Sequence, residues 1–416
     1  MSNVTCIKVH KVVKIIYYVA LVYKSMNKQI GVDQSLARKY NSATILDHLR
    51  LHAPISRAGL AEYTGLTRST VSRIIDQLQA ENLVHEIGAQ QEKIGRPGTL
   101  IELNPSGGIA VGVEIGVDFV SIILTNFVAQ ILWREHVSLP DESDVRSYLR
   151  EAEKLIYAAL LVAKADGLQP LGIGVGVWGL VDIQKGEVRF APNLKWRDVP
   201  LKKLWEGRFG MTVFVENDAN AAAMGEYYLG AAKNVDDFIY INTGIGLGGG
   251  IISAGKLFRG WNGYAGEIGH MTIDPDGEPC MCGKRGCWET LVGSRVAVQN
   301  YKIHTGREVP FEELVQLLRA NDPISIEIFS KMALALGIGI GSLANIFYPR
   351  CIVVGGALNQ VSDIILPIAR DTFAKNSLFQ PQQDIKIIPS ALGPDSCVLG
   401  CVALVLDEVI RQRTQL

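Results

Sequence analysis

The sequence lacks two features that would each have fixed a broad class of protein. It has no excess charge, because 41 lysines and arginines nearly balance 42 aspartates and glutamates, so the net charge of −1 carries no information about nucleic acid. It also has no disulfide framework. Only seven cysteines occur in 416 residues, and four are scattered, mostly among apolar residues, as is typical of core positions in a reducing cytoplasm. These four are Cys6, Cys351, Cys397 and Cys401. The 48% hydrophobic content and the length therefore predict a soluble, cytoplasmic globular protein of two or three domains.

An apolar run near the N-terminus is shorter than a membrane span. Residues 12–23 form a run of about a dozen residues, whereas a bilayer span needs roughly 20. The run has the length of a signal-peptide core, but no convincing small-residue cleavage site follows it. We expect residues 1–30 to be an irregular extension, or Met26 to be the native start. N-terminal sequencing tests this, since a mature chain that begins before Val12 would contradict it.

One segment concentrates the residues that bind metals. Between Glu267 and Glu289 the chain places one histidine and three cysteines within 18 residues, with Gly277, Gly283 and Gly286 available for tight turns. Zinc prefers four nitrogen and sulfur ligands in a tetrahedron. We predict a structural zinc site, because four protein ligands leave no open position for a catalytic water. Its ligands are His270, Cys280, Cys282 and Cys287. The alternative is four unrelated residues on a surface loop.

Residues 41–105 change in character and predict three short amphipathic helices followed by a hairpin. The first covers Ala43 to Leu51, Ser56 and Thr67 are the expected N-caps of the next two, and Gly65 ends the second. In the third helix the apolar residues recur at helical spacing, which leaves polar and basic side chains at its N-terminal end. Those side chains are Arg68, Ser69, Thr70, Ser72 and Arg73. Two helices joined by such a turn form a helix-turn-helix that fits a DNA major groove.

Two predicted strands, residues 83–88 and 99–103, would complete this domain as a wing. The loop between them places Arg96 between Gly95 and Pro97, where a cation on a stiff backbone suits phosphate or a narrow minor groove. We therefore predict a winged helix-turn-helix DNA-binding domain over residues 31–104, with Arg96 as a DNA contact. A helical hairpin used only for packing is the alternative.

Beyond Pro105 strands alternate with helices, which indicates an α/β body. One strand, residues 211–217, ends at Asn217 and is followed by Asp218 and a helix predicted to run to Ala232. A carboxylate placed there can remove a proton from a sugar hydroxyl in a kinase, or accept hydrogen bonds from sugar hydroxyls in a sensor. A role at the helix N-terminus is an equally good interpretation. Asn193, Glu267 and Glu289 supply further donors and acceptors for a polyol.

On these residues the chain resembles the ROK family, which contains bacterial sugar kinases and sugar-responsive transcriptional repressors. The resemblance begins near Asn41 and runs to the C-terminus. Its motifs lie at residues 240–271, 280–289 (CxCGxxGCxE), 216–226 and 353–359. It implies a two-lobed, actin-like α/β fold of the ribonuclease H-like ATPase and sugar kinase type over residues 105–416. Lobe I would cover about 105–227 plus the C-terminal helix, and lobe II about 228–395.

The resemblance also implies which residues bind a sugar. The contacts fall on Asn217, Asp218, Glu267, His270 and Glu289, with Asn193 as a helper. His270 would use one ring nitrogen for zinc and the other for sugar, so the metal would fix the tautomer and the angle of the imidazole. Four tryptophans lie close to these motifs, and one could stack on a sugar face, although burial in the core is the more common fate of a tryptophan. They are Trp178, Trp196, Trp261 and Trp288.

The phosphate loops bear on whether the chain phosphorylates a sugar or senses it. Family kinases carry Asp-x-Gly-Gly-Thr where this chain has residues 114–118, Glu-Ile-Gly-Val-Asp. Val117 adds a side chain and Asp118 adds negative charge, and both oppose nucleotide binding. The glycine-rich segment 244–250 remains and could cradle a phosphate or act as a hinge. We expect no catalytic residue and no ATP. In the alternative, an ATP-dependent sugar kinase, Asp218 would be the base.

Taken together, the motifs predict a cytoplasmic transcriptional repressor of sugar uptake or catabolism genes, with structural zinc. Its expected partners are operator DNA, a small sugar or sugar phosphate, and further copies of the chain in a homodimer or tetramer. Some family members respond to a phosphotransfer-system protein instead, so such a protein is another candidate partner. The sequence leaves open whether the sugar is glucose, xylose or N-acetylglucosamine.

Overall fold

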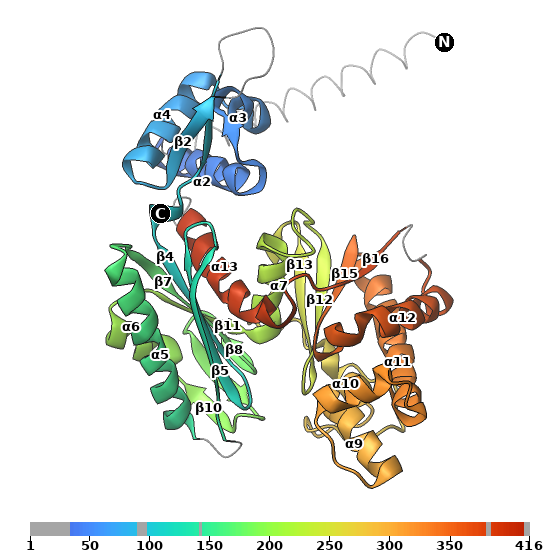
Figure 1. The fold of residues 1–416 in the computed structure, drawn as a ribbon. Helices are drawn as coiled ribbons and strands as arrows, with labels where there is room; N and C mark the ends of the chain where they lie inside the picture. Colours follow the sequence, from blue (N-terminus) through green and yellow to red (C-terminus); the bar gives the residue numbers. More distant parts are fainter. Residues whose placement is uncertain (1–33, 90–97, 141–143, 380–383, 412–416) are drawn as a thin grey trace, which may run out of the picture.

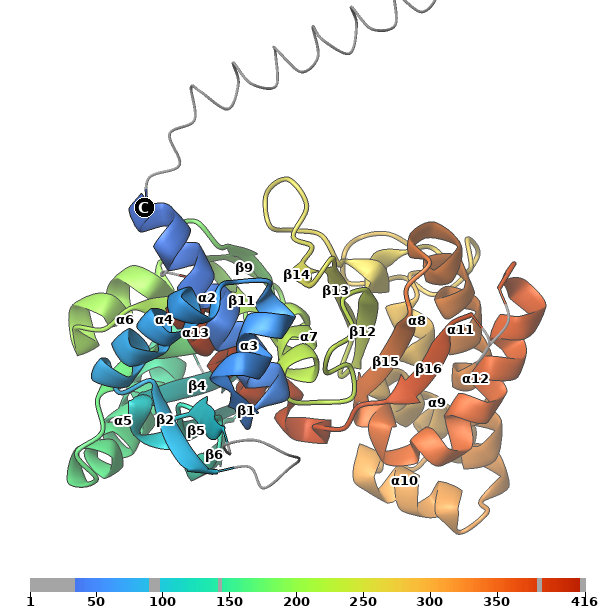
Figure 2. The same ribbon diagram turned by 90° about the horizontal axis from the view of Figure 1, so that it is seen from above.

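The computed structural model describes residues 34–89, 98–140, 144–379 and 384–411. A small N-terminal domain lies over one of two larger α/β lobes, and the second lobe stands beside the first (Figures 1 and 2). The predicted extension at residues 1–30 and the predicted DNA contact Arg96 lie outside the described residues.

The N-terminal domain has three helices and a three-stranded sheet. The elements are α2 (Gln34–His52), β1 (Ile55–Ser56), α3 (Arg57–Thr64), α4 (Arg68–Ala80), β2 (Val84–Ala89) and β3 (Thr99–Leu103), with strand order β1-β3-β2. The hydroxyl groups of Ser56 and Thr67 accept hydrogen bonds from the backbone at the starts of α3 and α4, and Gly65 ends α3 with a φ of 69°. These three predictions are confirmed.

The predicted start of the first helix is wrong. It begins at Gln34 rather than at Ala43. No proline or glycine separates Gln34 from Ala43, so nothing in the backbone stops the helix from extending beyond its apolar stretch.

Lobe I is built on a five-stranded sheet of order β11-β7-β4-β5-β6. Its elements are β4 (Ile109–Ile115), β5 (Phe119–Asn126), β6 (Ile131–Ser138), α5 (Val145–Ala165), β7 (Pro170–Val177), α6 (Leu201–Phe209) and β11 (Val213–Asn217). A small sheet of β8 (Leu180–Asp182), β9 (Glu187–Ala191) and β10 (Trp196–Val199) is attached to it. The C-terminal helix α13 (Ser396–Arg411) returns to this lobe, as the family resemblance implied.

Glycines in the central strands explain how α13 packs so closely. A Cβ on Gly112 would lie 2.3 Å from the carbonyl oxygen of Val398, and one on Gly174 would lie 2.0 Å from that of Cys401. Any larger residue would therefore push the helix off the sheet.

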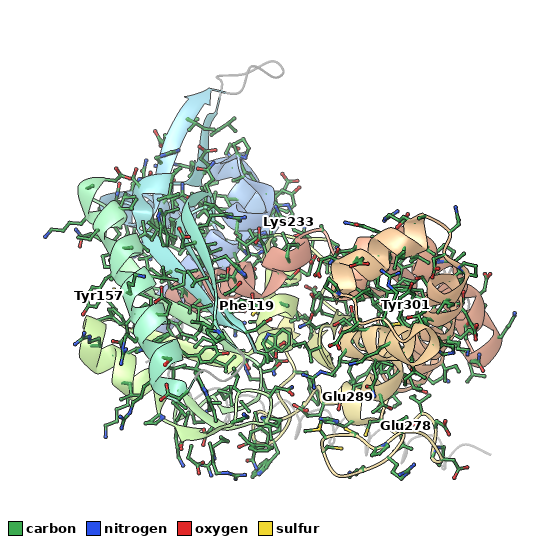
Figure 3. All side chains as sticks on the ribbon, turned by 60° about the horizontal axis from the view of Figure 1, so that its bottom comes forward. Phe119, Tyr157, Lys233, Glu278, Glu289 and Tyr301 are labelled. Atoms are coloured by element: carbon green, nitrogen blue, oxygen red, sulfur yellow. The ribbon has the colours of Figure 1, made fainter. Side chains whose placement is uncertain are left out.

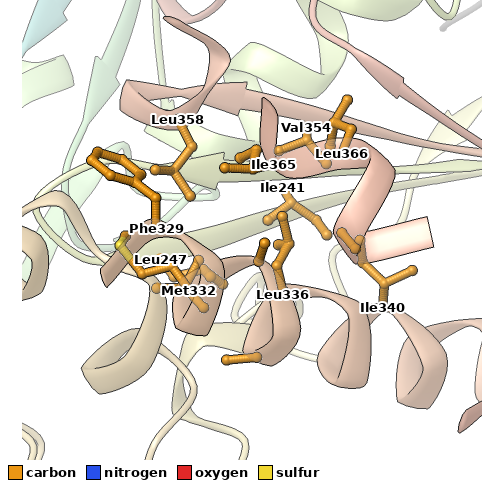
Figure 4. Packing of buried hydrophobic residues seen from close by; sticks show 14 of the residues in the cluster. Ile241, Leu247, Phe329, Met332, Leu336, Ile340, Val354, Leu358, Ile365 and Leu366 are labelled. Atoms are coloured by element: carbon orange, nitrogen blue, oxygen red, sulfur yellow. The ribbon is translucent and has the colours of Figure 1, made fainter. Parts of the chain in front are cut away.

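Lobe II contains a second five-stranded sheet, of order β14-β13-β12-β15-β16. Its strands are β12 (Phe238–Thr243), β13 (Leu247–Ser253), β14 (Lys256–Leu257), β15 (Cys351–Gly356) and β16 (Lys386–Pro389). Its helices are α8 (Glu289–Val292), α9 (Ser294–Thr305), α10 (Phe311–Arg319), α11 (Pro323–Phe347) and α12 (Ser362–Asn376). Side chains of α11 and α12 interlock with those of the sheet to form the core (Figure 4).

In the described part of the chain, α11 alone is long and apolar enough to cross a membrane, but 61% of its most apolar window is buried inside the molecule. A buried core helix accounts for this composition.

Helix α7 (Asp218–Tyr228) lies between the two lobes and packs against both α13 and β13 (Figure 1). The prediction that it runs to Ala232 is wrong. The buried carboxylate of Glu226 accepts a hydrogen bond from the backbone N–H of Ala231, which breaks the helical pattern just after Tyr228.

Candidate functional site

The four predicted metal ligands converge on one point. One ring nitrogen of His270 and the sulfur atoms of Cys280, Cys282 and Cys287 all lie within 4.8 Å of one another. The sulfurs of Cys282 and Cys287 are 3.6 Å apart, and Nδ1 of His270 is 3.7 Å from Sγ of Cys280. A tetrahedral zinc ion with Zn–S bonds of about 2.3 Å separates its ligands by about 3.8 Å, so these residues fit zinc.

The backbone of the loop supports this convergence. Gly283 and Gly286 have φ values of 86° and 65°, where residues with a side chain are strained. At Gly286 an added Cβ would lie 1.4 Å from the carbonyl oxygen of Asp274. The predicted role of glycine in turning this loop is confirmed at these two positions.

The two ring nitrogens of His270 face different groups. Nδ1 faces the cysteine cluster, and Nε2 lies 3.8 Å from a carboxylate oxygen of Glu267. Burial raises the pKa of Glu267, the charge of His270 opposes this rise, and Glu289 adds to it. Of the predicted sugar contacts, Glu267 thus lies on the Nε2 side, whereas Glu289 lies on the Nδ1 side with the metal ligands. The double role of His270 stays a prediction.

Glu289 lies against the metal ligands and not apart from them. Its Oε1 is 2.7 Å from Sγ of Cys280 and 3.3 Å from Nδ1 of His270. Its other carboxylate oxygen borders Gly246, where an added Cβ would lie 2.7 Å away. Glu289 therefore joins the metal cluster to the glycine-rich segment, a connection that the sequence did not reveal.

Asp218 is held by one amide on each carboxylate oxygen. Nδ2 of Asn217 donates to Oδ1 at 2.9 Å, and Nδ2 of Asn242 donates to Oδ2 at 2.9 Å. Asn242 comes from β12, so its hydrogen bond joins lobe II to the start of α7. Sequence reasoning missed Asn242, whose only signal is a polar residue near the end of a buried strand.

Asn217 acts as the N-cap of α7. Its Oδ1 accepts hydrogen bonds from the backbone of Ala219 and Asn220, and its Nδ2 also donates to the carbonyl oxygen of Gly179. The helix N-terminal role was the alternative interpretation for the Asp218 carboxylate, but the capping side chain is that of Asn217. Its role as a sugar contact stays a prediction.

Burial perturbs two carboxyl groups at the base of the site. It raises the pKa of Asp218 to about 7, although the hydrogen bond from Asn242 opposes the rise. Burial also raises the pKa of Glu114 to about 8, and the nearby charge of Asp218 adds to that shift. Near neutral pH, Glu114 is mainly protonated and Asp218 is divided between both forms, so Asp218 can exchange hydrogen bonds with hydroxyl groups in either direction.

A buried ion pair gives a second bond between the lobes. Glu216, at the end of β11, is 2% exposed, and one of its oxygens accepts a hydrogen bond from Nε of Arg259 at 2.8 Å. Arg259 follows β14 in lobe II, so the pair crosses the same boundary as the Asp218–Asn242 bond. Neither residue was predicted to contribute to the site.

The role of Asn193 as a sugar contact stays a prediction. This residue lies in the turn between β9 and β10, is exposed, and makes no hydrogen bond to the other predicted sugar contacts among the described residues. Of the four tryptophans near the motifs, Trp196 and Trp288 are buried and Trp261 is 96% exposed.

The predicted DNA-contacting residues gather at the start of α4. Arg68, Ser69 and Arg73 are exposed, whereas Thr70 and Ser72 are half-buried. The apolar face of the same helix is fully buried, as predicted, by Val71, Ile74, Ile75 and Leu78. The buried face thus holds α4 in place, with Arg68 and Arg73 exposed in its first two turns.

An arginine that was not predicted fixes α4 in the domain. Arg57 donates hydrogen bonds to Asp76 at 2.7 Å, to Glu86 at 3.1 Å and to the carbonyl oxygen of Ser72 at 3.1 Å. It therefore ties α3, α4 and β2 together and sets how the basic turn of α4 is presented.

The N-terminal domain contacts the body through α2. Residues of α2 and α13, including Leu49 and Val402, share one hydrophobic cluster. Beside it, the guanidinium carbon of Arg50 lies 4.0 Å from the ring centroid of Tyr228, the last residue of α7. The Tyr228 hydroxyl donates a hydrogen bond to Asp407 of α13. One helix, α7, thus carries Asp218 at its first position and contacts the N-terminal domain at its last.

Comparisons with known proteins identify the two parts. Residues 110–408 match the model of the ROK family, and residues 39–91 match the model of the MarR family. The chain belongs to the ROK family. The putative xylose repressor of Caldicellulosiruptor sp. (strain Rt8B.4) is 34% identical over 391 residues, which cover 91% of this chain and 98% of that protein. The predicted family is confirmed, and this ROK relative is a regulator.

Solved ROK structures confirm the predicted fold class. A ROK family transcriptional regulator, a homologue of the E. coli Mlc protein, superimposes with a TM-score of 0.78 at 25% identity over 91% of this chain and 99% of that chain. A ROK family glucokinase from Streptomyces griseus, solved with glucose and AMPPNP, gives a TM-score of 0.64 at 32% identity over 71% of this chain and 99% of that chain. The regulator matches both the N-terminal domain and the body, whereas the kinase matches a smaller share of the chain.

Proposed function

We propose that this ROK protein is a transcriptional repressor of sugar uptake or catabolism genes, and that a small sugar bound between its lobes controls its affinity for operator DNA. One observation carries this proposal. The chain joins a DNA-binding domain, whose helix α4 begins with exposed basic residues, to a polar site between the lobes that contains Asp218. The relative named a xylose repressor makes xylose the first sugar to test.

The DNA-binding part of the proposal rests on α4. Its first turn would enter the major groove, with Arg68, Ser69 and Arg73 closest to the bases or phosphates and Thr70 and Ser72 beside them. Arg96 would contact the backbone or minor groove. A single helix-turn-helix reads few base pairs, so we propose a homodimer or tetramer that presents paired helices to two half-sites.

The sugar-binding part rests on the residues around the start of α7. Asp218, Glu267 and the Nε2 atom of His270 would exchange hydrogen bonds with sugar hydroxyls, with Glu289, Asn217 and Asn193 as further contacts. His270, Cys280, Cys282 and Cys287 would hold the zinc ion. When bound, zinc would supply rigidity, because it would fix the ring of His270 and the loop that carries Glu289.

Communication between the parts would run through the bonds that cross the lobes. A sugar that engages Asp218 changes the surroundings of the Asn242 bond and the start of α7, whose other end contacts Arg50. To lower operator affinity tenfold, the sugar must favour the low-affinity arrangement by about 1.4 kcal/mol.

The test is a titration of purified protein with its own upstream DNA, with and without xylose, glucose and N-acetylglucosamine. We expect one sugar to weaken binding of the wild-type protein and to have no effect on Asp218→Asn, which still binds DNA. Asp166→Asn, at an exposed position after α5, is the matched control and should respond like the wild type. Failure of every sugar to change DNA binding would contradict sugar control.

The similarity to the glucokinase supports one alternative, an ATP-dependent sugar kinase that carries a DNA-binding domain. Incubation with ATP, magnesium and the same sugars distinguishes the two. Phosphorylated product that forms with the wild type and disappears with Asp218→Asn would favour the kinase. A phosphotransfer-system protein as the controlling partner is tested by adding it to the DNA titration in place of sugar.

A further inference from the structure

An aromatic ring covers the turn at residues 114–118, where family kinases carry their first phosphate loop. The ring of Phe119 packs directly on Gly116, where an added Cβ would lie 2.1 Å from the ring atom Cε1. His136 stacks on Phe119 with ring centroids 4.9 Å apart, which holds the ring in place. In Figure 3, Phe119 lies on the side of lobe I that faces lobe II, and Tyr157 lies on the outer side.

The backbone of this turn is also engaged. The N–H group of Gly116 donates to the carbonyl oxygen of Phe119 at 3.0 Å, which closes a tight turn between β4 and β5. A phosphate-binding loop works by pointing such N–H groups at phosphate oxygens. Here the Gly116 N–H is already used within the turn.

A second ring covers the glycine-rich segment of lobe II. Trp178 follows β7 in lobe I, yet its indole reaches Gly244, where an added Cβ would lie 2.9 Å from atom Cη2. Trp178 also meets Phe119 edge to face, with centroids 6.4 Å apart. The two rings thus form a continuous aromatic wall from Gly116 to Gly244, across both segments that could have held a phosphate.

Two carboxyl groups lie beside this wall. Glu114 is 6% exposed and neighbours both Trp178 and Asp218. Arg259 also lies at the boundary between the lobes, and its guanidinium group is already paired with Glu216. Phosphate groups in proteins are usually met by arginine, lysine or several backbone N–H groups. A phosphate here would meet two carboxyl groups and two apolar rings.

We propose that the rings of Phe119 and Trp178 restrict the site between the lobes to unphosphorylated sugars and exclude sugar phosphates together with nucleotides. The inference rests on the proposed sugar control and narrows the ligand class. A phosphoryl group on the hydroxyl next to Asp218 would project toward Gly116 and Gly244, into the space that the two rings occupy. Exclusion of a competing ligand by steric conflict is a common source of specificity.

The experiment is isothermal titration of the full chain with xylose, glucose and N-acetylglucosamine, then with glucose 6-phosphate, N-acetylglucosamine 6-phosphate and magnesium-ATP. We expect one free sugar to bind at least about a hundredfold more tightly than any phosphate ester, with no detectable ATP binding. A phosphate ester that binds as tightly as its free sugar, or more tightly, would overturn the proposal.

Two variants test the named residues. In Phe119→Ala combined with Trp178→Ala, the preference for free sugar should fall by at least about tenfold, because both rings that occupy the space for a phosphoryl group are removed. Tyr157→Ala, an aromatic change on the outer face of α5, should keep the wild-type preference. An unchanged preference in a double variant that keeps its folded circular dichroism spectrum and binds the free sugar would overturn the assignment to these residues. A double variant that fails to fold leaves the wild-type comparison as the deciding result.

The outcomes separate this inference from the proposed function. Tight binding of a phosphate ester that also releases DNA would overturn the inference and leave sugar control intact. Absence of binding by all free sugars and all phosphate esters would overturn sugar control, and with it the inference.

Discussion

At the scale of single residues, burial of the Glu114 carboxyl group lowers the free energy of unfolding as the pH rises. Its folded-state pKa is about 8, against an ordinary value of 4.5. Below about pH 4.5 both folded and unfolded chains hold this proton. As the pH rises to about 8, the unfolded chain loses the proton while the folded chain keeps it, so the free energy of unfolding falls. Glu114→Gln removes this loss, and the variant should gain stability relative to the wild type, by a few kcal/mol at most, between about pH 5 and 8.

Urea unfolding of both proteins at several pH values measures the effect. The difference between wild type and variant cancels the titration of groups that both share. Glu135→Gln, an exposed change on β6, is the control and should show no such trend. A constant difference across this pH range would mean that Glu114 ionises normally.

Sequence reasoning at this scale succeeded where the residues of a site are close along the chain. His270 and the three cysteines lie within one loop, so their spacing predicted the cluster that the structure forms. Asn242 and Arg259 were missed because their contacts with Asp218 and Glu216 join segments far apart in the sequence. No local pattern distinguishes an asparagine that binds Asp218 from any other asparagine at a strand end.

At the scale of elements, the metal loop should depend on its ligands. Cys282→Ser removes one thiolate, and we expect loss of bound zinc and of the sugar response, because the loop has little core of its own. Metal analysis of the purified protein, together with sugar titration, measures both effects. Met281→Ser, which changes the exposed neighbouring side chain, should retain zinc. Full zinc content in Cys282→Ser would contradict the ligand assignment.

Helix α4 should contribute to DNA binding in a different way from the wing. Arg73 is expected to read base edges, so Arg73→Ala should weaken binding to the operator more than binding to unrelated DNA. Arg96 is expected to contact phosphate, so Arg96→Ala should weaken both kinds of binding evenly and should lower the slope of log affinity against log salt by about one. Arg208→Ala on α6 is the control. Wild-type binding by both Arg73→Ala and Arg96→Ala would contradict the DNA-binding assignment.

The sequence predicted elements best where a local signal controls them. Ser56 and Gly65 delimit α3 and Thr67 begins α4, as expected, because caps act on the nearest backbone groups. The end of α7 could not be predicted, since it depends on Glu226. That carboxylate is buried where α7 meets the chain before α13, and it accepts hydrogen bonds from Ser390 and Ser396 as well as from Ala231. This is a tertiary arrangement that overrides helix propensity.

At the scale of the whole molecule, α7 is the element that reaches from the proposed sugar site to the DNA-binding domain. Its 11 residues span about 16 Å, from Asp218 near Asn242 to Tyr228 beneath Arg50. The hydrogen bonds of Glu226 also join α7 to Ser396 at the start of α13. The two-lobed fold was predictable from its motifs, but this route was not, since Arg50 and Tyr228 are far apart in the sequence and belong to different domains.

Arg50→Gln should therefore uncouple the two activities without removing either. The variant loses the cation over the ring of Tyr228, so sugar binding and DNA binding measured separately should each stay within about threefold of wild type. The factor by which sugar weakens DNA binding should fall from about tenfold toward one, a loss of about 1.4 kcal/mol of coupling. Tyr228→Phe, which keeps the ring and loses the bond to Asp407, should have a smaller effect in the same direction, and Tyr40→Phe on the exposed face of α2 should have none. If Arg50→Gln retains the full sugar effect, coupling must pass to the DNA-binding domain by another contact, and the hydrophobic cluster shared by α2 and α13 becomes the next to test.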